Sequence, residues 1–427
     1  MISKRKNLLK LDIEKISKQR NRKDEVYRIG YEVLGSILLG FCNYLHESFI
    51  EDKIERVFFL SRDGKIIKKA YEMIYPDDSR TLQYLYVSRH ATTIPSLFEV
   101  KDFSELVRIV SPFLHNQDVG SLLDICGIAR EIVADDICIQ KINMEEDINK
   151  ISVERQVILF EYIMKQKSEN YKQQSEYLKR YLNEEGFKGR VAVVDVGWNG
   201  TIQKSLQKYV DTSNTSIIGY YLGVRNLATQ SYYYGLIRKG YFFDPNRNKK
   251  YSNMFRFTAE VIDNLFLGIS GTVKCYKEEE GRIVPVLGDC EYGKSESEMV
   301  QSFQNASFDF IRDYIKVHGI PNINVRIEDI INIYKCFAVY PSLKTISIFS
   351  EFYMSDGNVM KKMIPEKRIY YYLFHADELK REFNMNVCKI WFLKWLIKIP
   401  FPYFEVLCLL SNVGVKSKLE KGLIKAN

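Results

Sequence analysis

The sequence lacks the patterns that mark several common classes of protein. Its eight cysteines form no Cys-x-x-Cys motif and no pairing pattern, and its five histidines are scattered along the chain. These spacings argue against a structural zinc site and indicate reduced thiols. The basic N-terminal residues are not followed by the apolar stretch of a signal peptide, and no segment has the length of a clean transmembrane span. We therefore expect a cytoplasmic protein.

A strong excess of one charge is also missing. The chain has 62 Lys and Arg against 54 Asp and Glu, a net charge of +8 over 427 residues. This mild excess suits phosphorylated ligands or an anionic membrane face, but it is too diffuse to indicate binding to nucleic acid. The apolar fraction of 46% and the charged fraction of 27% are typical of a globular protein. The length suffices for a large core and more than one structural unit.

The strongest signal that is present lies at residues 190–206. A short β-branched run ends in Asp195, a turn bracketed by Gly197 and Gly200 follows, and Thr201 begins a helical pattern. A strand that ends in an acid, a glycine-rich turn and a helix start form a common phosphate site at the C-terminal edge of a parallel sheet. The alternative is a tight connection in which Asp195 only caps the helix.

A second stretch of the same construction lies upstream. Residues 56–60 have an apolar strand pattern, residues 61–65 read Ser-Arg-Asp-Gly-Lys, and a helical pattern follows at residues 66–74. Two such turns in one chain predict a bipartite phosphate site.

The two turns offer different groups to a phosphorylated ligand. The backbone amides of residues 61–65 with the side chains of Arg62 and Lys65 match a diphosphate, because guanidinium groups bind phosphate oxygens bidentately. Residues 199–201 at a helix start suit a monophosphate, and Arg89 is a candidate third anion clamp. Alternatively, Arg62 and Arg89 form surface ion pairs, and Asp63 only shapes the turn. The candidate phosphate-binding residues are Ser61, Arg62, Gly64, Lys65, Arg89, Gly197, Asn199, Gly200 and Thr201.

The remaining chain predicts an α/β fold with a parallel, Rossmann-like sheet. Residues 82–88 should form a strand parallel to residues 56–60 with a right-handed crossover. Residues 103–187 have helical patterns that are too long for a loop, so we predict a helical insertion at about residues 101–188. Further strands are expected at 190–195, 216–224 and 232–243, a hairpin with an acidic turn at 271–286, and helices from about residue 296.

These patterns divide the chain into a core at residues 1–290 and a C-terminal helical domain at residues 291–427, whose contact with a substrate or with a membrane is left open. In that domain Lys389, Lys394 and Lys398 fall on one half of a helix and leave a Trp/Phe/Leu face. Such a helix can lie in a membrane interface or pack this face on the domain. We favour core packing.

Three motifs carry a resemblance to a known family: Leu-Ser-Arg-Asp-Gly at residues 60–64, Tyr-Val-Ser-Arg at 86–89 and Val-Val-Asp-Val-Gly-Trp-Asn-Gly at 193–200. They resemble bacterial polysaccharide-biosynthesis proteins that are commonly named haloacid-dehalogenase-like hydrolases of surface-glycan (capsule or O-antigen) gene clusters. In many members a phosphatase domain precedes this region, but nothing before Tyr31 carries its Asp-x-Asp motif. The resemblance covers roughly residues 28–290.

The same region resembles type I phosphoribosyltransferases. In that family one loop holds the pyrophosphate of phosphoribosyl pyrophosphate, and a strand–acid–Thr/Gly turn holds the ribose and its 5-phosphate. By this resemblance, residues 61–65 form the pyrophosphate loop and residues 195–201 the ribose-phosphate loop. The chain departs from the family signature because Asp195 has no adjacent acid and Asn199 replaces the usual Thr before the glycine.

Related glycan-assembly proteins transfer ribofuranose 5-phosphate from this donor to an acceptor sugar, and a separate phosphatase then removes the phosphate. The resemblance therefore implies a cytoplasmic pentosyltransferase that uses Mg²⁺, with Asp195 as the metal-contacting residue. It also implies a lipid-linked surface-glycan acceptor, with peripheral contact to the inner face of the cytoplasmic membrane left open.

The implied reaction displaces pyrophosphate at C1 through a transition state with oxocarbenium character. Mg²⁺ neutralises the leaving group and the loop amides stabilise its charge. The candidate catalytic residues are Asp63, Asp195 and Glu260. Asp63 and Glu260 are the candidate bases, Glu260 because a lone acid in an apolar run can carry a raised pKa.

Three other functions compete with this one. A phosphatase of the haloacid-dehalogenase type needs a second acid two residues after its nucleophile, but Gly197 follows Asp195 at that distance and Lys65 follows Asp63. A nucleotide-sugar glycosyltransferase needs an Asp-x-Asp metal motif after a strand, which we do not find. A non-catalytic scaffold for glycan assembly stays open.

Overall fold

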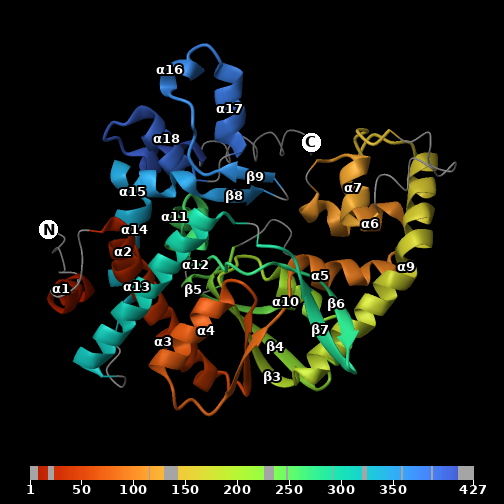
Figure 1. The fold of residues 1–427 in the computed structure, drawn as a ribbon, viewed down its shortest axis with the longest axis horizontal. Coiled ribbons are helices and arrows are strands. Elements are labelled where there is room, and N and C mark those ends of the chain that lie inside the picture. The colour runs from red at the N-terminus through yellow and green to blue at the C-terminus, as the bar shows by residue number, and fades with distance from the viewer. Residues whose placement is uncertain are drawn as a thin grey trace, which may run out of the picture.

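Five parallel strands form the central sheet, in the order β2-β1-β3-β4-β5 (Figure 1). The computed structural model describes residues 8–17, 24–114, 116–128, 143–225, 235–246, 249–290, 292–319, 325–356, 359–385 and 388–411. This sheet confirms the predicted α/β class and its parallel arrangement. Residues 232–234 of the last predicted strand lie outside the described residues. The strands are β1 (Arg56–Leu60), β2 (Thr81–Leu85), β3 (Gly189–Asp195), β4 (Thr215–Gly223) and β5 (Ile237–Phe243).

Helices precede, connect and follow these strands. Those of the first half are α1 (Leu8–Ile16), α2 (Glu25–Arg28), the π-helical turn η2 (Ile29–Leu34), α3 (Gly35–Glu51), α4 (Gly64–Ile74), α5 (Arg89–Thr93), the 3₁₀ helix η3 (Ile94–Glu99), α6 (Phe103–Val110), α7 (Val119–Ile125), α9 (Val153–Glu184) and α10 (Thr201–Leu206). Those of the second half are α11 (Ser252–Arg256), α12 (Ala259–Phe266), α13 (Lys294–His318), α14 (Ile327–Ala338), α15 (Leu343–Ile348), α16 (Ile369–Tyr372), α17 (Ala376–Met385) and α18 (Lys389–Ile397).

Side chains along the strands alternate between two hydrophobic layers, as the two-residue period of a strand requires. Phe59 and Val194 face a layer that contains α3, α4 and α13. Phe58 and Val193 face a second layer, which contains the C-terminal half of α9 and α10. Because both faces are covered, these strands read in the sequence as nearly continuous apolar runs.

The predicted helical insertion lies between β2 and β3. Its helices α6 and α7 pack on the first half of α9 around a small hydrophobic core of their own. In Figure 1 this lobe stands at the upper right, and α9 runs from it down to the sheet. Residues 129–142 of the insertion are outside the described residues.

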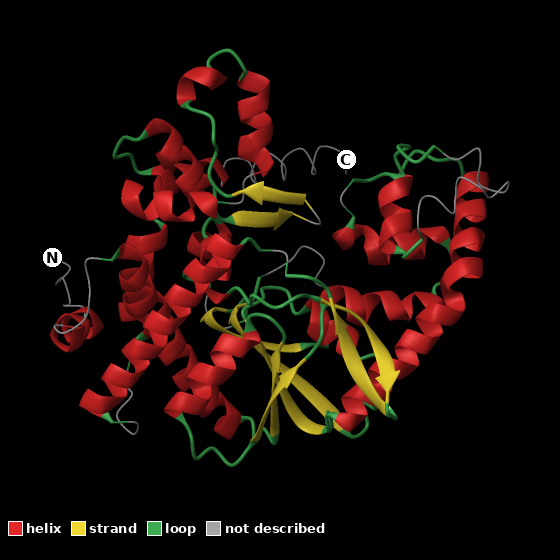
Figure 2. Cartoon of the chain, viewed as in Figure 1, coloured by secondary structure: helices red, strands yellow, loops and turns green. Residues whose placement is uncertain are grey.

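A hairpin of β6 (Val273–Glu279) and β7 (Arg282–Leu287) forms a separate antiparallel sheet beside α9 (Figure 2). It confirms the hairpin predicted at residues 271–286. Gln174 anchors the hairpin to α9, because the Gln174 amide donates to the Tyr276 carbonyl at 2.9 Å and accepts from the Tyr276 N–H at 2.8 Å.

One helical segment, Glu25–Glu51, is long and apolar enough to cross a membrane by length and composition alone. The sequence reading did not identify it as a span. In the fold 72% of its most apolar window is buried, and α13, α14 and α4 pack against it. Gly30 and Gly35 permit close contact with α13, because a Cβ at either position would come within 3 Å of Phe303 or Phe310. The segment therefore packs as a core helix.

The C-terminal region departs from the all-helical prediction. It contains an antiparallel hairpin of β8 (Tyr353–Asp356) and β9 (Val359–Lys362), visible as the second small sheet in Figure 2. The Gly-Asn pair at residues 357–358, between the two strands in the sequence, is a common hairpin signal that the helical prediction overlooked. The region also shares one continuous hydrophobic cluster with α3 and α4, so buried packing crosses the predicted domain boundary at residue 290.

Helix α18 packs its aromatic face on the core, as favoured from the sequence. Trp391 is fully buried and donates its indole N–H to the Ala338 carbonyl at 2.7 Å. Its ring makes edge contacts with Phe337 and Phe349. The helix ends at Ile397, and Lys398 after it adopts a left-handed conformation.

Candidate functional site

The two predicted phosphate turns meet at one edge of the sheet. β1 and β3 are adjacent and parallel, with Phe59 opposite Val194, so the residues that follow each strand emerge side by side. The chain passes from β1 to β2 on one side and returns to β3 on the other, which makes this point a topological switch of the sheet. In open α/β sheets such a switch at the carboxyl ends of the strands is the usual ligand position.

Asp63 and Asp195 form a pair of neighbouring carboxyl groups at this edge. Burial raises the pKa of Asp63 to about 6 and that of Asp195 to about 7, and the charge of Asp63 adds to the rise at Asp195. The positive charge of Arg62 acts against the rise at Asp63, and that of Arg89 acts against both. Both acids keep partial solvent contact. The pair can therefore hold a proton near neutral pH or attract a cation.

Arg62 occupies the first turn in a left-handed conformation, with φ of 71°. Its backbone N–H donates to the Tyr84 hydroxyl at 2.7 Å, so this amide is already bonded. Its guanidinium donates to the hydroxyls of Thr272 and Tyr292, each at 2.8 Å. A non-glycine residue in this region of φ carries a backbone cost, which these bonds offset.

The other residues of the first turn have different surroundings. The Ser61 hydroxyl bridges to the backbone of Val87 and ties the turn to the end of β2. Gly64 begins α4, and a Cβ there would lie 2.8 Å from the Phe59 carbonyl carbon. Lys65 is exposed. Ser61 and Gly64 thus shape the turn, whereas Lys65 keeps its charge in solvent.

The Asp63 carboxylate does not cap helix α4. It accepts a hydrogen bond from the backbone N–H of Gly268 instead. Gly268 lies against the first turn so closely that a Cβ there would be 2.5 Å from the Arg62 Cα. Loop 267–270 therefore forms one wall of the site.

The second turn is held by its own backbone and by Arg238. The Asp195 carboxylate accepts from the N–H groups of Val196 and Gly197. Gly200 has φ of 74° and is the N-cap of α10, so the alternative in which Asp195 caps this helix is wrong. The Arg238 guanidinium donates to the Asn199 carbonyl at 2.9 Å. Helix α10, which Thr201 begins, has six residues, so its dipole adds little and the turn itself must supply the donors.

Three further charged residues lie at this edge, and two of them were missed. Glu260, predicted as a candidate base, and Asp263 share one face of α12. Burial raises the pKa of both, and at Asp263 the charges of Glu260 and Asp63 add to the rise. Arg225 follows β4, faces the Trp198 ring at 5.4 Å and opposes both shifts. The i, i+3 spacing of the two acids in the sequence was the signal that could have revealed Asp263.

Trp198 links the second turn to α12. Its indole N–H donates to the Asp263 carboxylate at 3.3 Å, and its ring stacks on Phe243. The second carboxylate oxygen of Asp263 and the amide oxygen of Asn199 are buried without a hydrogen-bond partner among the described residues. Polar atoms of this kind are the natural contacts of a bound ligand or an ordered water.

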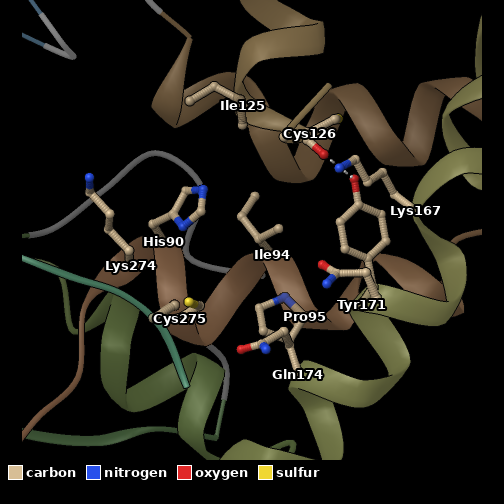
Figure 3. Close-up of a pocket in the computed structure, with 13 residues that line it drawn as sticks. His90, Ile94, Pro95, Ile125, Cys126, Lys167, Tyr171, Gln174, Lys274 and Cys275 are labelled. Atoms are coloured by element: carbon tan, nitrogen blue, oxygen red, sulfur yellow. Dashed lines mark hydrogen bonds between the residues drawn. The ribbon is translucent and has the colours of Figure 1, made fainter. Parts of the chain in front are cut away.

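A cavity of about 100 Å³ lies beside α5, the helix that begins at Arg89, and neither Asp63 nor Asp195 lines it (Figure 3). It is lined by α5 and η3 of the core, α7 and α9 of the insertion, and β6. His90, the neighbour of Arg89, points into it, and its ring bonds the backbone of Lys274 and Ile125. Lys167 of α9 lines the opposite wall. The cavity therefore adds polar and basic groups between the insertion and the site edge.

The comparisons with known proteins give no family. No protein-family model matches the chain, and no curated protein matches it.

The donor set fits a magnesium ion that is shared with a substrate, but not one held by protein ligands alone. Among the described residues, no group of three or more His, Cys, Asp or Glu side chains is placed to hold a metal. Mg²⁺ is commonly bound by one or two carboxylates together with substrate phosphates and water. Asp63 and Asp195 supply those two carboxylates, and a cation between them would relieve their repulsion.

Proposed function

We propose that this chain transfers ribofuranose 5-phosphate from phosphoribosyl pyrophosphate to a hydroxyl group of a surface-glycan acceptor. The observation that carries the proposal is the meeting of two phosphate-type turns at the switch point of one parallel sheet. Neither turn would suffice alone, because the donor carries phosphate groups at both ends of its ribose. Adjacent strands lie about 4.8 Å apart, so turns that leave neighbouring strand ends can contact the two ends of one sugar phosphate.

Each turn has a distinct role in this proposal. Arg62 and Arg89 bind the pyrophosphate, because they bring positive charge to the end of β1 and the end of β2. The turn at residues 197–201 binds the 5-phosphate through its backbone, and Asp195 accepts hydrogen bonds from ribose hydroxyls. Lys65 adds positive charge from the solvent side. Ser61 and Gly64 hold the first turn in shape.

Asp195 would hold Mg²⁺ together with the donor phosphates, and the ion would supply charge neutralisation for the departing pyrophosphate. The residues of the chain perform the remaining work. The bond from C1 to the pyrophosphate oxygen breaks as the acceptor oxygen bonds to C1, and the acceptor proton passes to a carboxylate. Asp63 is the first candidate for this role, because it lies in the turn that would hold the leaving group. Glu260 is the second candidate base.

The test is a transfer assay on the purified full chain. Phosphoribosyl pyrophosphate, Mg²⁺ and synthetic lipid-linked glycans are supplied, and pyrophosphate release is measured alongside donor binding by calorimetry. We expect release that depends on the acceptor and is lost in Asp195→Asn. Absence of release with every acceptor, together with absence of donor binding, would overturn the proposal.

The same preparation separates the competing functions. A sugar-phosphate phosphatase would release inorganic phosphate from pentose and hexose phosphates, a reaction that the raised-pKa acid pair also suits. A scaffold would bind no donor, and Asp195→Asn would change only its stability. Two products are therefore measured in every reaction, pyrophosphate and orthophosphate.

A further inference from the structure

Large apolar side chains project into solvent at the tip of the C-terminal region. Ile369 and Tyr370 of α16 are 44% and 60% exposed, and Leu373 and Phe374, which follow it, are 73% and 86% exposed. We call these four residues the apolar tip. In Figure 1 α16 stands at the top of the molecule, away from the sheet. Contiguous exposed apolar residues of this kind mark interaction surfaces.

The charge of the chain is concentrated in the same region. Residues 361–427 contain thirteen Lys and Arg and six Asp and Glu, a net charge of +7 out of +8 for the whole chain. The overall composition suggested that the positive excess is diffuse along the chain, but the sequence of this segment shows that it is not. Almost all of it lies in the segment that carries the apolar tip.

The acids near the tip are engaged locally, whereas several basic residues are not. Glu366 pairs with Lys362, and Glu378 and Glu382 accept hydrogen bonds from the hydroxyls of Tyr371 and Tyr372. In contrast, Lys367, Arg368, Lys380 and Arg381 form no ion pair with another described residue, and Lys367 lies over the Tyr371 ring. The surface around the tip is therefore both apolar and positively charged.

We propose that the apolar tip inserts into the interface of an anionic lipid bilayer. Leu and Phe side chains provide the buried area, Tyr370 suits the headgroup level, and the Lys and Arg residues are attracted to anionic headgroups. A second copy of the chain is a poorer occupant, because both copies would bring the same basic residues, Lys367, Arg368, Lys380 and Arg381, to the contact. This inference does not depend on the transfer reaction.

The fold gives the tip a rigid base. Tyr372 between the exposed residues is buried against Phe392 and Leu396 of α18, and Leu379 of α17 packs there as well. A second group of exposed apolar residues, Ile397, Ile399 and Phe401, extends from the end of α18. Trp395 is partly buried near this end, with Lys398 over its ring, and provides a fluorescent reporter.

Vesicle co-sedimentation of the full chain tests the proposal. Vesicles of phosphatidylcholine alone are compared with vesicles that contain phosphatidylglycerol, at low and high salt. We expect binding to the anionic vesicles that weakens with salt. The double substitution Leu373→Ser, Phe374→Ser should lower the partition coefficient at least about tenfold, because two large side chains lose their apolar burial.

The matched control is the double substitution Val153→Ser, Val157→Ser, which removes two exposed apolar side chains from α9 in the insertion. It should leave binding unchanged, and circular dichroism melting should show all variants folded. A blue shift of Trp fluorescence on anionic vesicles would support insertion. Equal binding of the wild-type chain and the Leu373/Phe374 variant would overturn the proposal. The proposal would also be overturned if the wild-type chain bound no vesicles and instead formed a concentration-dependent dimer that the Leu373/Phe374 variant does not form.

Discussion

At the scale of single residues, the site depends on acids whose pKa values are raised by burial and by each other. A carboxyl group with a folded pKa above its ordinary value stabilises the fold at low pH, and this contribution is lost as pH rises through the folded pKa. For Asp195 the loss falls between about pH 4 and pH 7. In metal-free buffer, Asp195→Asn should therefore gain stability relative to wild type as pH rises.

We expect the difference to reach about 1–2 kcal/mol at pH 8 and to be near zero at pH 4, after allowance for the partial solvent contact of the side chain. Urea unfolding of both proteins at the two pH values measures it. If the difference in unfolding free energy between Asp195→Asn and wild type is the same at pH 4 and pH 8, the pKa of Asp195 is not raised in the fold. Asp211→Asn, at an exposed carboxylate in the loop before β4, is the control.

The same repulsion predicts a response to magnesium. At pH 8 Asp63 and Asp195 are both ionised, so a cation that binds only the folded chain should raise its melting temperature by about 1–2 °C at concentrations several times its dissociation constant. The double variant Asp63→Asn, Asp195→Asn should show no rise. Calorimetric melts with MgCl₂ and with NaCl at equal ionic strength separate specific binding from screening. An equal rise in both salts would argue against a cation at the pair.

Kinetic measurements on variants can identify which acid is the catalytic base. If Asp63 takes the acceptor proton, Asp63→Asn should lower kcat by about 10²–10⁴-fold and remove the acidic limb of the pH–rate profile. Glu260→Gln should keep that limb, with a smaller effect. The opposite pattern would assign the base to Glu260. Asp263→Asn tests whether the Trp198 contact only positions the second turn, in which case KM changes more than kcat.

At the scale of elements, loop 267–270 is the part of the site that depends most on a small residue. Gly268→Ala would place a Cβ 2.5 Å from the Arg62 backbone, so the first turn or the loop must move. We expect a loss of about 1–3 kcal/mol in unfolding free energy and weaker donor binding. Gly293→Ala meets nothing within 4 Å and should cost less than about 1 kcal/mol. If Gly268→Ala binds phosphoribosyl pyrophosphate as tightly as wild type, contact with loop 267–270 does not position Arg62 for binding.

Periodicity predicted most of the elements that carry the site. The strands that end near Asp63 and Asp195 were predictable, because a buried parallel strand reads as an apolar run and the turns contain glycine. Glu260 was selected from the sequence as a lone acid in an apolar run, and its spacing from Asp263 was a usable signal. The position of Arg225 was not predictable, since it reaches the site only through the path of the chain after β4. The helical reading failed at β8 and β9, where each strand has only four residues and too few side chains to show a two-residue period.

At the scale of the whole molecule, one hydrophobic cluster unites the sheet, the N-terminal helices and the C-terminal helices. Trp391→Ala, which removes a fully buried ring from α18, should therefore cost about 3–5 kcal/mol. The loss should appear in a single transition that also unfolds the sheet. Denaturation followed by near-UV and far-UV circular dichroism measures this. Two separate transitions would instead support independent domains on either side of residue 290.

Helix α9 connects the insertion lobe to the central sheet in one unbroken element. Its 32 residues span about 48 Å, from the insertion lobe to the turn that leads into β3, and β3 ends at Asp195. A tilt of about 5° at its base would carry its far end through about 4 Å. We therefore expect a ligand that displaces the insertion lobe to shift the base of α9 and, through it, the strand that ends at Asp195.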